Sequence, residues 1–233
     1  MANTSSNRSS KRQMHLAAFI VAGPGRPGGW RYPSSESDWL NPGYYQSIAR
    51  TLERGKFDMA FFADILAVPD RYQGSTDSQL RYGALGSMRL DPALVLSAMA
   101  AATQHLGLVA TRSTSYFQPF ELARSFATLD HLSAGRSGWN VVTSFQDAES
   151  KNFSMREQIP RHERYDRADE FLQVVHQLWD SWADDALALE RETPLFADPD
   201  KVRAIDHQGK WFDVRGPLNV PRRAVALRRQ LVS

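Results

Sequence analysis

Four short apolar runs recur along the chain, and each is followed by a segment with helical periodicity. The runs cover residues 15–22, 57–63, 106–111 and 137–143, and the helical segments cover about 45–54, 91–102, 119–135 and 165–182. A continuous apolar run that ends at Gly, Pro or a polar residue is typical of a strand buried on both faces. Because strands alternate with helices, the pattern indicates parallel strands joined by right-handed crossovers. The sequence therefore predicts an α/β fold of four parallel strand-helix units, half of what a closed (β/α)8 barrel requires.

Three segments fall outside this rhythm. Residues 1–13 are rich in Ser, Asn and Arg without periodicity, which predicts a disordered leader before a domain at 14–221. Residues 202–214 contain a turn sequence at 207–210 and resemble a small hairpin inserted beside the sheet. Residues 222–233 form an atypical tail, in which four of the twelve residues are arginines, Arg222, Arg223, Arg228 and Arg229.

Composition excludes several classes of protein. The 233 residues carry a formal net charge of +2, and the tail supplies four positive charges and no acid, so residues 1–218 carry −2. A mildly acidic body does not favour nucleic-acid binding. No stretch approaches the roughly 18 apolar residues of a membrane span, so we expect a soluble, cytoplasmic protein. The chain has no cysteine, and its six histidines lack metal-ligand spacing, so no metal site is expected and a metal-dependent barrel hydrolase is disfavoured.

Polar residues follow the predicted strands at the points where ligands bind in parallel β/α folds. Asp64 follows the second strand, Thr111 ends the third, and Asn140 lies in the fourth. The carboxyl ends of these strands meet at one rim, and aromatic residues flank them, a combination that suits a planar heterocycle. The flanking aromatic residues are Trp30, Tyr116, Phe117 and Trp139. The alternative is that Asp64 and Thr111 only cap helices and turns.

The densest charged cluster, residues 161–167, lies at the start of the fourth predicted helix. Solvated pairing between charges one helical turn apart explains many such clusters. His162 and Tyr165 are three residues apart, however, and could share one helical face toward the mouth of the barrel.

Four motifs occur in a fixed order along the chain: YYQSIARTLERGKFD at 44–58, GWNVVTS at 138–144, RYDRADEF at 164–171 and VRGPLNVPR at 214–222. Together they resemble the nitrilotriacetate monooxygenase component A family of bacterial-luciferase-like flavin monooxygenases. The likeness covers residues 13–222. It implies that the four units are the N-terminal half of a TIM-type barrel.

The resemblance also implies a two-component flavin-dependent monooxygenase. Such an enzyme uses reduced FMN, delivered by a separate NAD(P)H:flavin reductase, and dioxygen to oxygenate a small organic substrate, here of the aromatic sulfone or aminopolycarboxylate class. A homo-oligomer is expected. Carried over residue by residue, Asp64 should lie beside the flavin ring, Thr111 should hydrogen-bond it, and Asn140 and Tyr165 should contact it. The resemblance assigns no catalytic acid or base.

Two features depart from the family pattern. The family commonly has a flavin-contacting histidine four residues before the tyrosine; that place is Arg161 here, and His162 comes one residue later, so both are candidates. The family also continues beyond residue 222 into a strand and a loop that helps hold the flavin phosphate, where this chain has its Arg-rich tail. We therefore expect a C-terminally truncated chain whose activity could be lost. The alternative function is a non-catalytic half-barrel remnant or self-association module, because a half barrel has open sheet edges.

Overall fold

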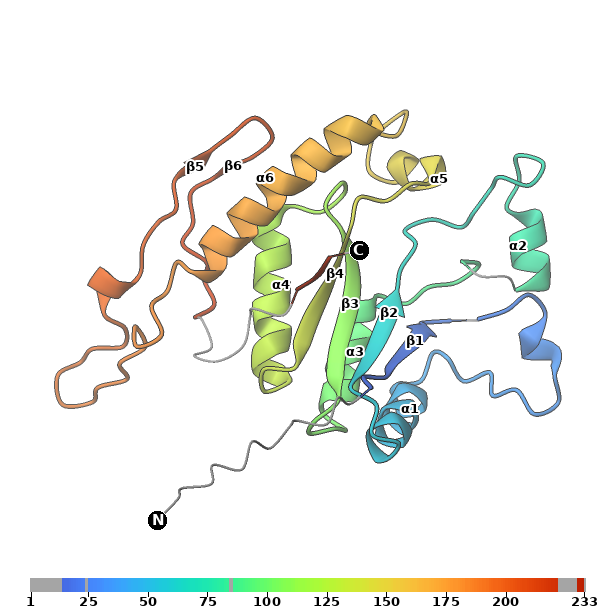
Figure 1. The fold of residues 1–233 in the computed structure, drawn as a ribbon, viewed down its shortest axis with the longest axis horizontal. Coiled ribbons are helices and arrows are strands. Elements are labelled where there is room, and N and C mark those ends of the chain that lie inside the picture. The colour runs from blue at the N-terminus through green and yellow to red at the C-terminus, as the bar shows by residue number, and fades with distance from the viewer. Residues whose placement is uncertain (1–13, 24, 84–85, 222–229, 233) are drawn as a thin grey trace, which may run out of the picture.

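The main sheet contains five parallel strands in the computed structural model, which describes residues 14–23, 25–83, 86–221 and 230–232 (Figure 1). Their spatial order is β1 (Ala17–Val21), β2 (Met59–Ala63), β3 (Gly107–Ser113), β4 (Ser137–Val142) and β7 (Gln230–Val232). The first four strands neighbour one another in chain order, so each crossover adds the next strand to the sheet. This arrangement confirms the four predicted parallel units.

A layer of helices covers one face of the sheet. It consists of α1 (Pro42–Arg54), α3 (Pro92–Ala100), α4 (Pro119–Leu132) and α6 (Arg161–Trp179), each packed on the next. The first three begin at a proline, which suits the first helical position because its fixed φ is already helical and its missing N–H is not needed there.

The helices differ from the prediction at their ends and in number. α6 begins at Arg161, four residues earlier than expected, and ends at Trp179. Two further helices, α2 (Asp77–Tyr82) and α5 (Asp147–Lys151), and two 3-10 turns, η1 (Gly29–Arg31) and η2 (Pro199–Lys201), were not predicted. Each is at most six residues long, too short for helical periodicity to appear in the sequence.

The core lies between the sheet and the helix layer. Alternate strand residues point into it, among them Phe62 of β2, Leu108 of β3 and Trp139 of β4. The Trp139 ring is 5.9 Å from the rings of both Phe126 of α4 and Phe171 of α6, so it joins two helices to the sheet. The intervening strand residues point to the opposite, concave face of the sheet.

The concave face is apolar at its centre and polar at its rim. Phe19 of β1 and Phe61 of β2 are register partners whose ring centroids lie 5.4 Å apart, and the Phe19 side chain is 70% exposed. Thr111 of β3 and Asn140 of β4 are register partners nearer the carboxyl ends of their strands. The topology thus brings two of the predicted site residues side by side.

The predicted hairpin is confirmed as β5 (His207–Gln208) and β6 (Asp213–Val214), which pair antiparallel on the outer side of α6 (Figure 1). Glu170 of α6 anchors it, because its carboxylate accepts hydrogen bonds from the backbone N–H groups of Trp211 and Phe212 and contacts His207 Nε2 at 3.2 Å. The largest single effect on the pKa of Glu170 is burial, which raises it. The hydrogen bonds from His207 and the two backbone groups outweigh burial and hold this pKa below its ordinary value.

The predicted leader at 1–13 and the four tail arginines lie outside the described residues. The end of the tail, β7, pairs in parallel with β4, so the described sheet has one strand beyond the four predicted. Its edges are β1 and β7. Among the described residues, no helix has the length and apolar character needed to cross a membrane.

Candidate functional site

A cavity of about 530 Å³ opens at the carboxyl ends of β2, β3 and β4, beside the start of α6. Five of the six predicted site residues line it, namely Asp64, Thr111, Asn140, Arg161 and Tyr165. The sixth, His162, does not. The fold therefore brings together residues that lie up to about a hundred positions apart in the sequence.

Thr111 and Asn140 form a buried polar pair in the floor of this cavity. The Thr111 hydroxyl donates to the Phe62 carbonyl oxygen at 2.7 Å and accepts from the Asn140 amide Nδ2 at 3.0 Å. Both residues are almost fully buried, with exposed fractions of 4% and 6%. Since a hydroxyl has one donor and two acceptor lone pairs, Thr111 keeps one lone pair to accept a bond from a ligand.

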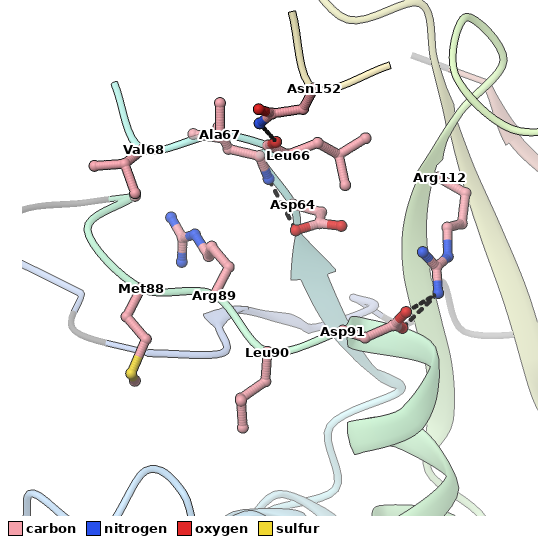
Figure 2. Close-up of a pocket in the computed structure, with 12 residues that line it drawn as sticks. Asp64, Leu66, Ala67, Val68, Met88, Arg89, Leu90, Asp91, Arg112 and Asn152 are labelled. Atoms are coloured by element: carbon pink, nitrogen blue, oxygen red, sulfur yellow. Dashed lines mark hydrogen bonds and ion pairs between the residues drawn. The ribbon is translucent and has the colours of Figure 1, made fainter. Parts of the chain in front are cut away.

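Asp64 lines both this cavity and a second one of about 420 Å³, whose lining residues are drawn in Figure 2. Its Oδ1 accepts a hydrogen bond from the backbone N–H of Ile65 at 2.9 Å. Burial raises the pKa of Asp64 to about 6, although the Ile65 hydrogen bond and the positive charges of Arg112 and Arg89 oppose this shift. Asp64 can therefore hold or release a proton near neutral pH.

The first turn of α6 brings Arg161 and Tyr165 to the cavity. The Arg161 guanidinium lies 5.9 Å from the centre of the Tyr165 ring, and Tyr165 is 52% exposed. His162 instead points along the exposed surface, with its Nε2 3.8 Å from Glu163 Oε1. The expectation that His162 and Tyr165 share a face toward the mouth is therefore wrong, and Arg161 shares the cavity lining with Tyr165 instead.

Arg164, one turn into α6, was missed by the sequence analysis. It lines the same cavity and donates to the carbonyl oxygen of Ser144, a residue in the left-handed region with φ 57°. A non-glycine residue in this conformation needs support from its surroundings, and this hydrogen bond supplies some of it. Arg164 thereby fixes the segment that leaves β4 at the edge of the cavity.

The predicted aromatic walls are wrong for all four residues. Trp139 points into the helix-facing core because it precedes Asn140 on the same strand, and consecutive strand residues face opposite ways. Tyr116 and Phe117 pack against Phe153, and Trp30 donates to the Tyr82 carbonyl oxygen away from the cavity. The aromatic residues that line the cavity are Phe19, Phe61, Phe145 and Tyr165. Phe19 and Phe61 lie in continuous apolar runs, so the sequence pattern does not reveal which face of the sheet they occupy.

The second cavity is bounded by the segments 64–68 and 86–91. Arg112, on β3, points into it but is occupied, because its guanidinium binds both carboxylate oxygens of Asp91 (Figure 2). Arg89 also lines this cavity and was not recognised in the sequence. Among the described residues, no cluster of three or more potential metal ligands occurs.

Comparison with known proteins identifies relatives for this fold and site. The family model described as luciferase-like monooxygenase matches residues 17–227. The chain is 53% identical over 214 residues to a dibenzothiophene-sulfone monooxygenase of Rhodococcus erythropolis (strain XP), covering 91% of this chain and 47% of the relative. It is 42% identical over 219 residues to nitrilotriacetate monooxygenase component A of Aminobacter aminovorans, covering 91% of this chain and 48% of the relative.

Solved structures agree with these sequence matches. The crystal structure of a long-chain alkane monooxygenase superimposes with a TM-score of 0.88 at 38% identity, covering 92% of this chain and 50% of that chain. A riboflavin lyase with modified FMN and riboflavin gives a TM-score of 0.84 at 37% identity, covering 91% and 48%. The chain spans about half the length of the relatives it matches. With its parallel strand-helix units and the match over residues 17–227, the chain belongs to the luciferase-like monooxygenase family.

Proposed function

We propose that this chain contributes the flavin ring site of a cytoplasmic, two-component monooxygenase that uses reduced FMN and dioxygen. The observation that carries the proposal is the convergence of Asp64, Thr111, Asn140, Arg161 and Tyr165 on one cavity at the carboxyl ends of the strands. Ligands of β/α barrels bind at this end. A riboflavin lyase of the same fold, at 37% identity, was crystallised with modified FMN, which supports a flavin as the ligand.

The cavity has features that fit a flavin ring. Its volume of about 530 Å³ falls in the range of small-molecule sites, which runs from about 300 to 1,000 Å³. Phe19, Phe61 and Tyr165 offer flat apolar surfaces, while Thr111 and Asn140 form a polar floor. This combination suits a planar ring with polar atoms along one edge.

Each residue then has a defined task. Reduced FMN, when bound, supplies the electrons for the activation of dioxygen. Thr111 accepts a hydrogen bond from the ring through its remaining lone pair, and Asn140 orients Thr111. Asp64, whose pKa burial raises to about 6, holds or releases a proton beside the ring. The aromatic side chains provide an apolar surface for the ring, and Arg161 provides positive charge at the rim.

Anaerobic titration with reduced FMN tests the ring site directly. We expect a saturable change in flavin absorbance with the wild-type chain. Thr111→Val removes one hydrogen bond to the ligand and the acceptor of the Asn140 amide, so it should weaken binding by about fivefold, equivalent to about 1 kcal/mol. Thr128→Val is the matched control, because Thr128 lies on the exposed side of α4 and its hydroxyl donates only to the Arg124 carbonyl oxygen.

Two results would reject the ring site. One is a wild-type chain that gives no spectral change with excess reduced FMN. The other is equal loss of affinity in the Thr111 and Thr128 variants, since an effect common to both would be a general loss of stability and not the loss of a ring contact.

The substrate and partner proposals concern the whole enzyme. We propose an aromatic sulfone or an aminopolycarboxylate as substrate, because relatives named for dibenzothiophene sulfone and for nitrilotriacetate are 53% and 42% identical to this chain. An assay with ¹⁸O₂, FMN, NADH and a flavin reductase would measure label in the product from each substrate. Absence of label from both would contradict the oxygenase proposal.

The expected homo-oligomer, and the alternative of a self-association module without catalysis, stay predictions. The relevant observation is the exposed Phe19 on the concave face. Sedimentation velocity over a range of protein concentrations measures the state of association. A single monomeric species at every concentration would contradict both the homo-oligomer and the self-association module.

A further inference from the structure

We propose that the second cavity, beside the flavin site, is a substrate subsite in which Arg89 binds a carboxylate group. The inference rests on the proposed function for its biological meaning, but the binding itself can be tested separately. It selects the carboxylate-bearing class from the two substrate classes considered above. The cavity of about 420 Å³ shares Asp64 and Ile65 with the flavin-site cavity, so a molecule held there would lie next to the proposed ring site.

Arg89 is a half-buried cation, and the described residues offer no hydrogen-bond partner to two of its nitrogens. These are Nε and Nη1, which are both buried and meet no hydrogen-bond acceptor in the part of the chain that the structure describes. Burial lowers the pKa of Arg89, and the nearby Asp64 carboxylate opposes this shift. A guanidinium stays protonated in proteins, so its unpaired N–H groups carry a desolvation cost that a bound oxyanion would remove.

The other charged groups around this cavity already have partners. Arg112 is bound by both oxygens of Asp91, so this pair is satisfied. Asp64 accepts the Ile65 N–H, and no ion pair joins it to Arg89 among the described residues. Figure 2 shows Arg89 reaching into the space between the segments that carry Val68 and Met88, apart from the Arg112–Asp91 pair. Arg89 is therefore the cation in this cavity that remains available to a ligand.

The segment that carries Arg89 is held firmly in place. The backbone N–H of Leu90 donates to the carbonyl oxygen of Ala22 at 2.9 Å, which ties the segment to the end of β1. A side chain at Gly23 would lie 2.4 Å from the Met88 carbonyl oxygen, so only glycine permits this close approach. Because its backbone is anchored on both sides of Arg89, the unpaired guanidinium is part of a built site.

A carboxylate matches the donors and the charge. The edge of a guanidinium presents parallel N–H groups that suit the two oxygens of a carboxylate. No carboxylate of the described residues contacts the Arg89 guanidinium directly. A neutral ligand would leave the guanidinium charge without a counter-ion in contact, whereas a carboxylate would supply one. Asp64, next to the same cavity, would respond by retaining its proton more strongly, because two nearby negative charges disfavour each other.

The test compares benzoate with benzamide, which have nearly the same shape and differ in charge. Titration of the wild-type chain, followed by NMR, should give benzoate at least about tenfold tighter binding than benzamide. Arg89→Met should remove this preference and leave benzamide affinity unchanged. Arg31→Met, in the exposed η1 turn, and Arg161→Met, at the other cavity, are the matched controls and should keep the preference.

Three results would overturn the subsite. These are equal affinity of the wild-type chain for both probes, retention of the preference in Arg89→Met, and its loss in Arg31→Met or Arg161→Met. The wild-type comparison stands even if the Arg89 variant does not fold. The same proteins are titrated with reduced FMN, so failure of the flavin site is seen separately. Benzoate selectivity without flavin binding would reject the proposed function alone, and flavin binding without benzoate selectivity would reject this inference alone.

Discussion

Asp64 illustrates how one buried carboxyl group couples stability to pH. Burial raises its pKa from 3.8 to about 6 in the folded chain, while Arg112 and Arg89 limit the shift and Asp91 adds to it. Below pH 3.8 the carboxyl is protonated in both states and contributes no difference. Between about pH 4 and 6 the unfolded state ionises first, so stability falls as the pH rises. Above this window, ionisation of the buried Asp64 carboxyl lowers the free energy of unfolding by at most about 3 kcal/mol.

We predict that Asp64→Asn removes this cost. The amide is neutral at all these pH values, and its oxygen can still accept the Ile65 N–H. The variant should therefore be more stable than the wild type at pH 7.5 and about equally stable at pH 3.5, as measured by urea unfolding at both values. Equal stabilities of the wild type and the variant at pH 7.5 would show that burial of the Asp64 carboxylate does not destabilise the folded chain.

Single residues also show where sequence reasoning was limited. Asp64, Thr111 and Asn140 could be predicted because each lies in or directly after a recognisable strand. Trp139 was misplaced because its neighbour Asn140 takes the cavity face, and a buried run gives no alternation from which to tell the two faces apart. Arg89 lies in a segment without periodicity, and only the packing of that segment against Ala22 and Gly23 reveals its position.

At the scale of elements, the hairpin β5–β6 is bound to α6 by the Glu170 carboxylate and by the packing of Phe212 against Phe171. Glu170 accepts backbone hydrogen bonds from Trp211 and Phe212, and a side chain at Gly209 would lie 2.0 Å from its Oε1. The hairpin has only two paired residues on each strand, too few to be stable alone. Its position on α6 therefore depends on contacts with the helix, and this carboxylate supplies the hydrogen bonds.

We predict that Glu170→Gln weakens the folded chain by about 1–2 kcal/mol at neutral pH, because it replaces charge-assisted hydrogen bonds with neutral ones. The pKa of Glu170 is held below 4.5, so its contribution is present above that pH and is lost as the pH falls through the folded-state pKa. Urea unfolding at pH 7 and pH 3 should show a larger difference between the variant and the wild type at pH 7 than at pH 3. Asp169→Asn, an exposed neighbour on α6, is the control and should have little effect at either pH.

The longer helices and the strands with continuous apolar runs could be predicted from the sequence, and the short helices could not. Four strands and four long helices could be located because continuous apolar runs and helical stripes extend over many residues. The start of α6 at Arg161 was hidden because its first turn is charged and lacks an apolar stripe. α2 and α5 have six and five residues, which is less than two helical turns, and no period can be read from them.

The whole molecule is a sheet with helices on one face and an apolar centre on the other. Phe19 and Phe61 pair on this concave face, where Phe19 is 70% exposed. Leu94 is similarly exposed, at 72%, but lies on α3 in the helix layer. Single exposed apolar residues are common, whereas a contiguous pair beside other apolar side chains forms a surface that binds apolar molecules.

We predict that this chain enhances the fluorescence of an apolar dye such as ANS while folded. Phe19→Ser should reduce the enhancement, because it breaks the aromatic pair, and Leu94→Ser should not. Circular dichroism of each variant checks that the fold is retained. Equal dye binding by all three proteins would place the apolar surface elsewhere.

Trp139 gives the sheet a built-in optical reporter. Its indole is on the strand position next to Asn140, with its ring on the back of the sheet and Asn140 on the cavity side. An oxidised flavin in the cavity would be separated from this indole by little more than the thickness of one strand. After absorption of light by this indole, one of six in the chain, its excitation energy would pass to the flavin by non-radiative resonance energy transfer, so occupancy of the barrel mouth can be followed as a loss of tryptophan fluorescence without attaching any label.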